Sequence, residues 1–142
     1  MSETNIAFFS GRLVDCANRF IASELVRRGV EGIVPSHGDI LCALFEEDGL
    51  AVSEIARRTH RTKSTICVLA SKLEGNGYVE RRPDPADRRA VGLWLTEKAR
   101  GLKPVFEAIS SDLADRITQS LSPEEAIVLG NLLARVVRNW KD

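Results

Sequence analysis

The residues with the clearest chemical potential lie on one short segment with the sequence RTKSTICVLASKL, residues 61–73. If Ile66 and Leu73 face a core, a helical step of about 100° per residue turns Ser64 and Val68 outward. Hydroxyl groups can meet base edges or phosphates, a valine can touch a thymine methyl group, and lysines suit phosphates. We therefore predict that this segment binds DNA through Arg61, Thr62, Lys63, Ser64, Thr65, Val68, Ser71 and Lys72.

A second cationic group follows in YVERRPDPADRRAV, residues 78–91. Arginines at the end of a hairpin can enter a narrow minor groove, where the negative potential is greatest. Asp87 is expected to orient the neighbouring guanidinium, and Asp84 to shape the turn. The residues predicted to contact DNA here are Arg81, Arg82, Asp87, Arg88 and Arg89. A solvated rim and a docking surface for an acidic protein remain alternatives.

The distribution of charge along the chain supports a polyanionic partner. The 142 residues have no formal net charge, but residues 57–103 hold twelve Lys or Arg against five Asp or Glu, so the rest of the chain has a net charge of −7. Such sorting is typical of a protein with one basic lobe. The length fits one domain, and no segment predicts a membrane span or a signal peptide. We expect a cytoplasmic protein with no membrane partner.

Apolar spacing predicts the helices that position these side chains. Residues 6–26 have the pattern of one long amphipathic helix. Ser36 and Asp39, in capping-box spacing, are expected to begin a second helix that Gly49 ends. Residues 50–77 carry two short helical patterns with a break near His60, which predicts a helix-turn-helix. Thr62 is the expected N-cap of its second helix.

Strand propensity and caps predict the rest. Residues 78–82 and 92–95 are expected to pair as a hairpin with a long polar tip. Thr96 is expected to cap a long helix that runs to about residue 120 and is kinked at Pro104. Ser122 and Glu125 form a capping box for a last helix. The fold class predicted is mainly α with a small β-hairpin wing.

Few residues suggest catalysis or metal binding. Three cysteines without C-x-x-C spacing and two histidines predict neither a metal site nor a disulfide framework. No nucleophile has a neighbouring base motif, so we expect no enzyme and no cofactor. A thiol-based redox sensor remains an alternative. Cys67 is expected to face the DNA, where oxidation adds bulk and charge, and Cys16 lies in the first helix.

These features together resemble the MarR family of winged helix-turn-helix regulators. The resemblance covers nearly the whole chain, and its most specific motif is Asp87-Arg88-Arg89 followed by Leu95-Thr96. It implies one domain over residues 1–142, with a DNA-binding lobe at 36–98 and helical dimerisation regions at 1–30 and 99–142.

The family resemblance also implies partners. A homodimer would bind an inverted-repeat operator in double-stranded DNA, usually as a repressor. In many members a small phenolic or other aromatic effector releases the DNA. The side chains expected to line its cleft are Phe9, Leu13, Cys16, Phe20, His37 and Leu41. The apolar members of this set are equally explained as core or dimer seam, and His37 by a capping or solvent role.

Overall fold

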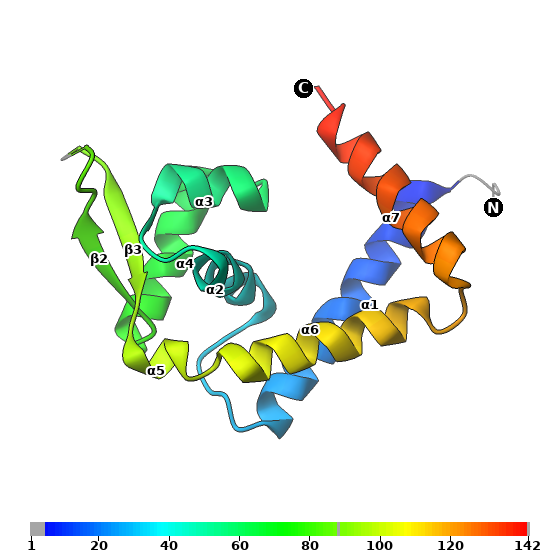
Figure 1. Cartoon of the computed structure of the whole chain (residues 1–142), viewed down its shortest axis with the longest axis horizontal. Coiled ribbons are helices and arrows are strands. Elements are labelled where there is room, and N and C mark those ends of the chain that lie inside the picture. The colour runs from blue at the N-terminus through cyan, green and yellow to red at the C-terminus, as the bar shows by residue number, and fades with distance from the viewer. Residues whose placement is uncertain (1–4, 88, 142) are drawn as a thin grey trace. The chain divides into compact units, whose positions relative to one another are not determined.

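The computed structural model describes residues 5–87 and 89–141, which form helices and one small sheet (Figure 1). The helices are α1 (Ile6–Arg27), α2 (Pro35–Glu46), α3 (Val52–Thr59), α4 (Lys63–Gly75), α5 (Glu97–Arg100), α6 (Lys103–Thr118) and α7 (Pro123–Arg138). The strands are β1 (Leu50–Ala51), β2 (Val79–Pro83) and β3 (Val91–Leu95). The predicted fold class, mainly α with a β-hairpin wing, is confirmed. None of the described helices is long and apolar enough to cross a membrane.

The chain divides into two compact units, Met1–Ile109 and Ser110–Asp142. The first contains the helix-turn-helix, the sheet and α1. The second contains the end of α6 and all of α7. The division into a DNA-binding lobe and dimerisation regions, predicted from the sequence, stays a prediction.

The helix-turn-helix is formed by α3 and α4, as predicted. His60 ends α3 in the left-handed region, with φ of +54°. Thr62 is the N-cap of α4, because its Oγ1 accepts a hydrogen bond from the N–H of Thr65 at 3.1 Å. A cap of this kind satisfies one of the backbone donors that a helix start leaves unpaired.

The core of the first unit fixes which side of α4 faces outward. Ile66 and Leu73 of α4 are fully buried with Ile55 of α3 and Leu93 of β3. Burial of side chains of this size contributes about 1.5–3 kcal/mol each. Rotating α4 about its axis would expose these residues, so its opposite face is held toward solvent.

The wing is larger than predicted. The hairpin of β2 and β3 is antiparallel, and β1 adds a third strand in the order β1-β3-β2. Residues 50–51 were predicted to belong to the helix-turn-helix, so this strand was not expected. Pro83, placed in the tip, instead pairs with Val91 at the end of β2. A proline is tolerated there because β2 is an edge strand.

Two aspartates shape the wing tip. Asp84 accepts a hydrogen bond from the N–H of Ala86 at 2.8 Å, which confirms its predicted role in the turn. Asp87 accepts one from the N–H of Arg89 at 2.9 Å, so its carboxylate also holds the backbone. The predicted pairing of Asp87 with Arg88 involves a residue outside the described ones and stays a prediction.

The predicted start of the second helix is wrong. α2 begins at Pro35, and the N-cap is Val34 rather than Ser36. The N–H of Val34 donates to Nδ1 of His37 at 3.2 Å, so a histidine takes the place of the expected capping-box acid. Pro35 explains the earlier start, since its fixed φ suits the first helical position. Asp39 instead forms an ion pair with Arg61.

The single kinked helix expected from Thr96 is also wrong. Thr96 does cap a helix, since its Oγ1 accepts from the N–H of Ala99 at 3.2 Å, but that helix, α5, ends at Arg100. The N–H of Leu102 donates back to the carbonyl of Ala99, and α6 then starts afresh. Pro104 lies in the first turn of α6, where its missing N–H costs nothing.

The last helix begins as predicted. The Oγ of Ser122 accepts from the N–H of Glu125 at 3.1 Å, and the Glu125 carboxylate accepts from the N–H of Ser122 at 2.9 Å. The reciprocal pair satisfies two backbone donors at the start of α7.

Candidate nucleic-acid interface

The outer face of α4 is exposed as predicted. Its central residue, Val68, is 63% exposed, although valine usually lies inside proteins. Lys63, Ser64 and Lys72 are exposed around it. The two lysines make no ion pair with any residue that the structure describes. Two ammonium groups, one hydroxyl group and one apolar side chain are thus exposed within three turns of the helix.

Three of the four predicted hydroxyl contacts are already hydrogen-bonded within the protein. Thr62 donates to Oγ1 of Thr65 at 3.0 Å while it caps the helix. Ser71 donates to the backbone carbonyl of Cys67 at 3.0 Å. The hydroxyl of Ser71 also accepts from Nη2 of Arg81 at 2.7 Å. Of the four, Ser64 is the hydroxyl that makes no hydrogen bond with the residues that the structure describes.

Arg61 lies in the turn before α4 and points back to α2. Its Nη2 donates to Oδ2 of Asp39 at 2.8 Å, and its Nη1 lies 3.4 Å from the carbonyl oxygen of Ser36. Burial raises the pKa of the Asp39 carboxyl, and the charge of Arg61 opposes that shift. Arg61 thus joins α2 to the helix-turn-helix.

The described wing arginines differ in their partners. Arg82 donates to Glu80 at 2.7 Å, and its guanidinium lies 5.2 Å from the centre of the Trp94 ring. Arg81 is bonded to α4, as noted above. The side chain of Arg89 is exposed at the tip and makes no ion pair within the described part of the chain. Arg89 is therefore the described wing arginine most available to a ligand.

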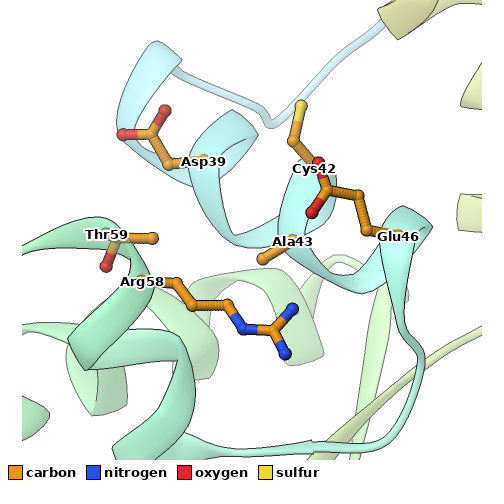
Figure 2. Close-up of a pocket in the computed structure, with 6 residues that line it drawn as sticks. All are labelled: Asp39, Cys42, Ala43, Glu46, Arg58 and Thr59. Atoms are coloured by element: carbon orange, nitrogen blue, oxygen red, sulfur yellow. The ribbon is translucent and has the colours of Figure 1, made fainter. Parts of the chain in front are cut away.

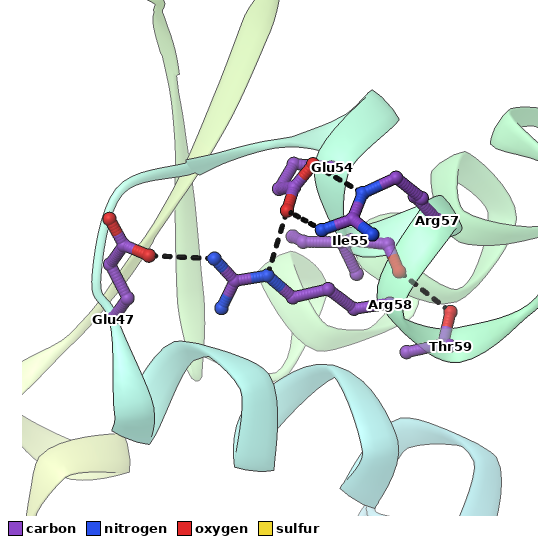
Figure 3. A network of polar contacts seen from close by, with 6 residues as sticks. All are labelled: Glu47, Glu54, Ile55, Arg57, Arg58 and Thr59. Atoms are coloured by element: carbon purple, nitrogen blue, oxygen red, sulfur yellow. Dashed lines mark hydrogen bonds and ion pairs between the residues drawn. The ribbon is translucent and has the colours of Figure 1, made fainter. Parts of the chain in front are cut away.

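A network of ion pairs on α3 was missed by the sequence analysis (Figure 3). Glu54 accepts from Arg57 at 2.6 Å and from Arg58 at 3.0 Å, and Arg58 also donates to Glu47 at 2.7 Å. Hydrogen bonds from Arg57 and then Arg58 lower the pKa of Glu54 to about 2. The spacing of Glu54 from two arginines three and four residues later was the available signal.

This network reduces the cationic surface below the count made from the sequence. Arg57 and Arg58 contribute to the +7 of residues 57–103, but Glu54 and Glu47 neutralise them locally. The basic character of the lobe therefore depends on α4 and the wing tip.

A groove of about 340 Å³ lies between α2 and α3 (Figure 2). Its lining residues are Asp39, Cys42, Ala43, Glu46, Arg58 and Thr59. Burial, and then the charges of Asp39 and Glu46, raise the pKa of the Cys42 thiol, which disfavours the thiolate. The described residues include no group of three or more metal-ligating side chains. Among the described residues, this groove thus offers neither a set of metal ligands nor a thiol that ionises readily.

The six residues expected to line an effector cleft differ in exposure. Phe9, Leu13 and Cys16 are exposed on α1, whereas Phe20 is half-buried. Leu41 is fully buried in α2 and belongs to the core of the lobe. Their contact with an effector stays a prediction.

His37 completes that set and has a structural role at the start of α2. Its side chain is 3% exposed, and Nδ1 accepts from the N–H of Val34. Burial, and then the charge of Lys72, lower the pKa of this imidazole. Both effects disfavour the charged imidazolium form of His37.

A cavity of about 500 Å³ lies where α1 ends and the chain turns toward α2. None of the six expected cleft residues lines it. Its lining residues are Ala22, Leu25, Val26, Gly29, Val30, Glu31, Gly32, Ile33 and Val34. Its size is within the range of small-molecule sites.

Comparison with known proteins agrees with this architecture. A model of the MarR family matches residues 33–91, from just before α2 to the start of β3. The transcriptional regulator SarZ of Staphylococcus haemolyticus is 30% identical over 100 residues, which cover 70% of this chain and 67% of SarZ. The regulator TtmR of Methylorubrum extorquens is 34% identical over 89 residues, 63% of this chain. The match spans 46% of TtmR, about half of its length.

The likeness extends over nearly the whole chain in three dimensions. A crystal structure of a MarR transcriptional regulator from Methanosarcina mazei superposes with a TM-score of 0.82 and 25% identity, covering 96% of each chain. The helix-turn-helix, the wing and the flanking long helices thus recur in one known architecture. The chain belongs to the MarR family of winged helix-turn-helix transcriptional regulators.

Proposed function

We propose that this protein binds double-stranded DNA sequence-specifically through α4 and the wing. The observation that carries the proposal is the exposed face of α4, where Lys63, Ser64, Val68 and Lys72 lie together on a helix anchored by the core. A helix of this kind fits the major groove, with lysines on phosphates, Ser64 on a base edge and Val68 against a thymine methyl group.

The wing extends the same surface. Arg89 is exposed at a tip whose backbone two aspartate hydrogen bonds hold. A guanidinium presented in this way suits the narrow minor groove beside the major-groove site. Arg88, next to it in the sequence, is proposed to act with it.

The active species is proposed to be a homodimer joined through residues 1–30 and 99–142. α7 has no buried residue, and its exposed apolar side chains include Ile127, Val128, Leu132, Val136 and Val137; Trp140 is exposed just beyond its end. An apolar stripe of this length needs a cover, and a second copy supplies an identical one. Two copies would place their recognition helices about one duplex turn, roughly 34 Å, apart on an inverted repeat.

Regulation is proposed to be repression relieved by a small aromatic effector. A ligand shifts DNA affinity only if it binds one arrangement of the dimer better than the other. Phe9, Leu13, Cys16, Phe20, His37 and Leu41 are proposed to meet the effector in the dimer. The cavity at the end of α1, which none of these residues lines, is a separate candidate ligand site. The protein is proposed to act in the cytoplasm, without enzymatic activity.

Selection of bound duplexes from a random pool tests DNA binding, dimer symmetry and half-site spacing together. The expected result is an enriched inverted repeat, with an affinity that falls steeply as salt rises. No enrichment would refute sequence-specific binding, and enrichment of a single half-site would refute the symmetric dimer.

Variants separate the roles within the surface. Arg89→Ala is expected to lower affinity and reduce the slope of log K against log salt by about 0.9, the value for one phosphate contact. Ser64→Ala is expected to change base preference at one position with the slope unchanged. Arg57→Ala, in α3, removes one positive charge that Glu54 already neutralises and is the control. Equal slopes for Arg89→Ala and the unmodified protein would refute the proposed role of the wing.

A further inference from the structure

The side chain of Arg81 turns toward α4 and not away from the protein. Arg81 lies in β2, opposite Leu93 of β3. Its Nη2 donates to the backbone carbonyl of Cys67 at 2.8 Å and to Oγ of Ser71 at 2.7 Å. Because Ser71 donates to the same carbonyl, the three groups close a triangle of hydrogen bonds.

Glu74 adds a third attachment on the same side of the helix. Its Oε2 accepts from the backbone N–H of Arg81 at 3.3 Å, and its Oε1 lies 3.9 Å from Nε of Arg81. Cys67, Ser71 and Glu74 are spaced four and three residues apart and so share one helix face. A single residue of the wing is therefore bonded across two turns of α4.

The neighbouring arginine makes no such link. Within the described part of the chain, Arg82 contacts Glu80 and Trp94, and both belong to the same hairpin. Arg81 and Arg82 are adjacent in the sequence and carry the same charge, but only the first joins two elements. Arg82 is thus a matched control for the removal of one guanidinium from β2.

We infer that Arg81 is a positioning residue that holds the wing against the recognition helix α4, with Ser71 as its acceptor, and that neither side chain contacts DNA. The inference rests on the proposed function for its consequence, since a wing at a fixed angle lets the helix and the tip engage two grooves at once. It replaces the direct DNA contacts expected of Arg81 and Ser71 from the sequence.

A positioning role and a phosphate contact differ in their response to salt. Loss of a phosphate contact reduces the slope of log K against log salt by about 0.9. Without the attachment the wing is ordered only when DNA binds, and the bound complex keeps the same phosphate contacts, so the slope stays constant. The affinity still falls, by about tenfold if the unattached wing adopts the binding orientation about one-tenth of the time.

The experiment is a double-mutant cycle of Arg81→Ala and Ser71→Ala, in which two quantities are measured: the affinity for operator DNA and the free energy of unfolding. With operator DNA, the expected result is that the double variant binds no more weakly than Arg81→Ala alone, with an unchanged salt slope. Two results would overturn the inference. One is that the losses of binding free energy in the two single variants add up in the double variant, and the other is that Arg81→Ala reduces the slope of log K against log salt by about 0.9. Arg82→Ala is expected to show no coupling to Ser71→Ala.

The second measurement uses urea unfolding of the free protein at one protein concentration, so it needs no DNA. Coupling between the two substitutions in the free energy of unfolding supports the attachment, and additivity within error overturns it. If the unmodified protein selects no duplex, the proposed function fails while this cycle still decides the attachment. If DNA binds but the cycle shows no coupling, the attachment fails and the proposed function stands.

Discussion

Gly49 is expected to tolerate no side chain, for two separable reasons. Its φ is +74°, a conformation that L-residues rarely adopt. A Cβ built there would also lie 2.6 Å from two atoms of the Trp94 ring. That ring belongs to β3 and carries the guanidinium of Arg82 over its face. Gly49→Ala therefore strains the backbone and displaces an aromatic side chain of the wing.

The chain offers a control for the first of these effects. Gly29 also has φ of +74°, but a Cβ there would meet nothing within 4 Å. The left-handed conformation costs an alanine about 1–2 kcal/mol at either position, offset in part by the stiffer unfolded chain. Overpacking against Trp94 adds about 1–3 kcal/mol at Gly49 alone. The difference between the two variants isolates the contact with the ring.

Urea unfolding at matched protein concentration measures both variants, because a dimer's stability depends on concentration. Gly49→Ala is expected to reduce the free energy of unfolding by about 1–3 kcal/mol more than Gly29→Ala. In a Trp140→Phe background, Trp94 is the remaining tryptophan, and its emission should change in Gly49→Ala. Equal costs with unchanged emission would refute the close approach of Gly49 to Trp94.

The remaining predictions concern titration. The Glu54 carboxyl group should titrate near pH 2, as followed by the NMR chemical shift of its carboxyl carbon. The stabilisation from its ion pairs is therefore present above about pH 4.5 and is lost as the pH falls toward 2. Arg57→Ala and Arg58→Ala should each raise that midpoint, and an NMR midpoint near 4.5 in the unmodified protein would contradict the network. The imidazole of His37 should titrate below 6.5, since burial lowers its pKa. The unfolded chain then binds the proton more readily, so the free energy of unfolding should decline as the pH falls through 6.5; an imidazole midpoint at or above 6.5 would contradict this.

Local signals predicted the helix starts whose caps lie within a few residues. Thr62, Thr96 and Ser122 were each expected as N-caps, and each accepts a hydrogen bond from the N–H three residues later. These interactions depend on neighbours in the sequence, so the sequence contains the information needed to predict them. The outward face of α4 was predictable for the same reason, since helical periodicity assigns faces once Ile66 and Leu73 are buried.

Features that depend on distant segments were missed. β1 consists of two residues, Leu50 and Ala51, that are strand only because they pair with Leu93 and Gly92. Nothing in so short a segment distinguishes a strand from the start of a helix. The start of α2 was misplaced because His37, and not an acidic residue, bonds the N-cap. That histidine has no capping signature of its own in the sequence.

The sequence by itself determined the family, the helix-turn-helix, the hairpin and the cationic segment, because each is a pattern of neighbouring residues. Tertiary structure decided which of the cationic and hydroxyl side chains are free. Arg61 bonds to a residue 22 positions away, and Arg81 to residues 10 and 14 positions away. Every arginine adds the same charge to a count made from the sequence. A guanidinium that is hydrogen-bonded to a carbonyl or a carboxylate of its own chain, however, is less available to a phosphate. Packing therefore reduced the predicted DNA surface to the face of α4 around Ser64 and the tip of the wing.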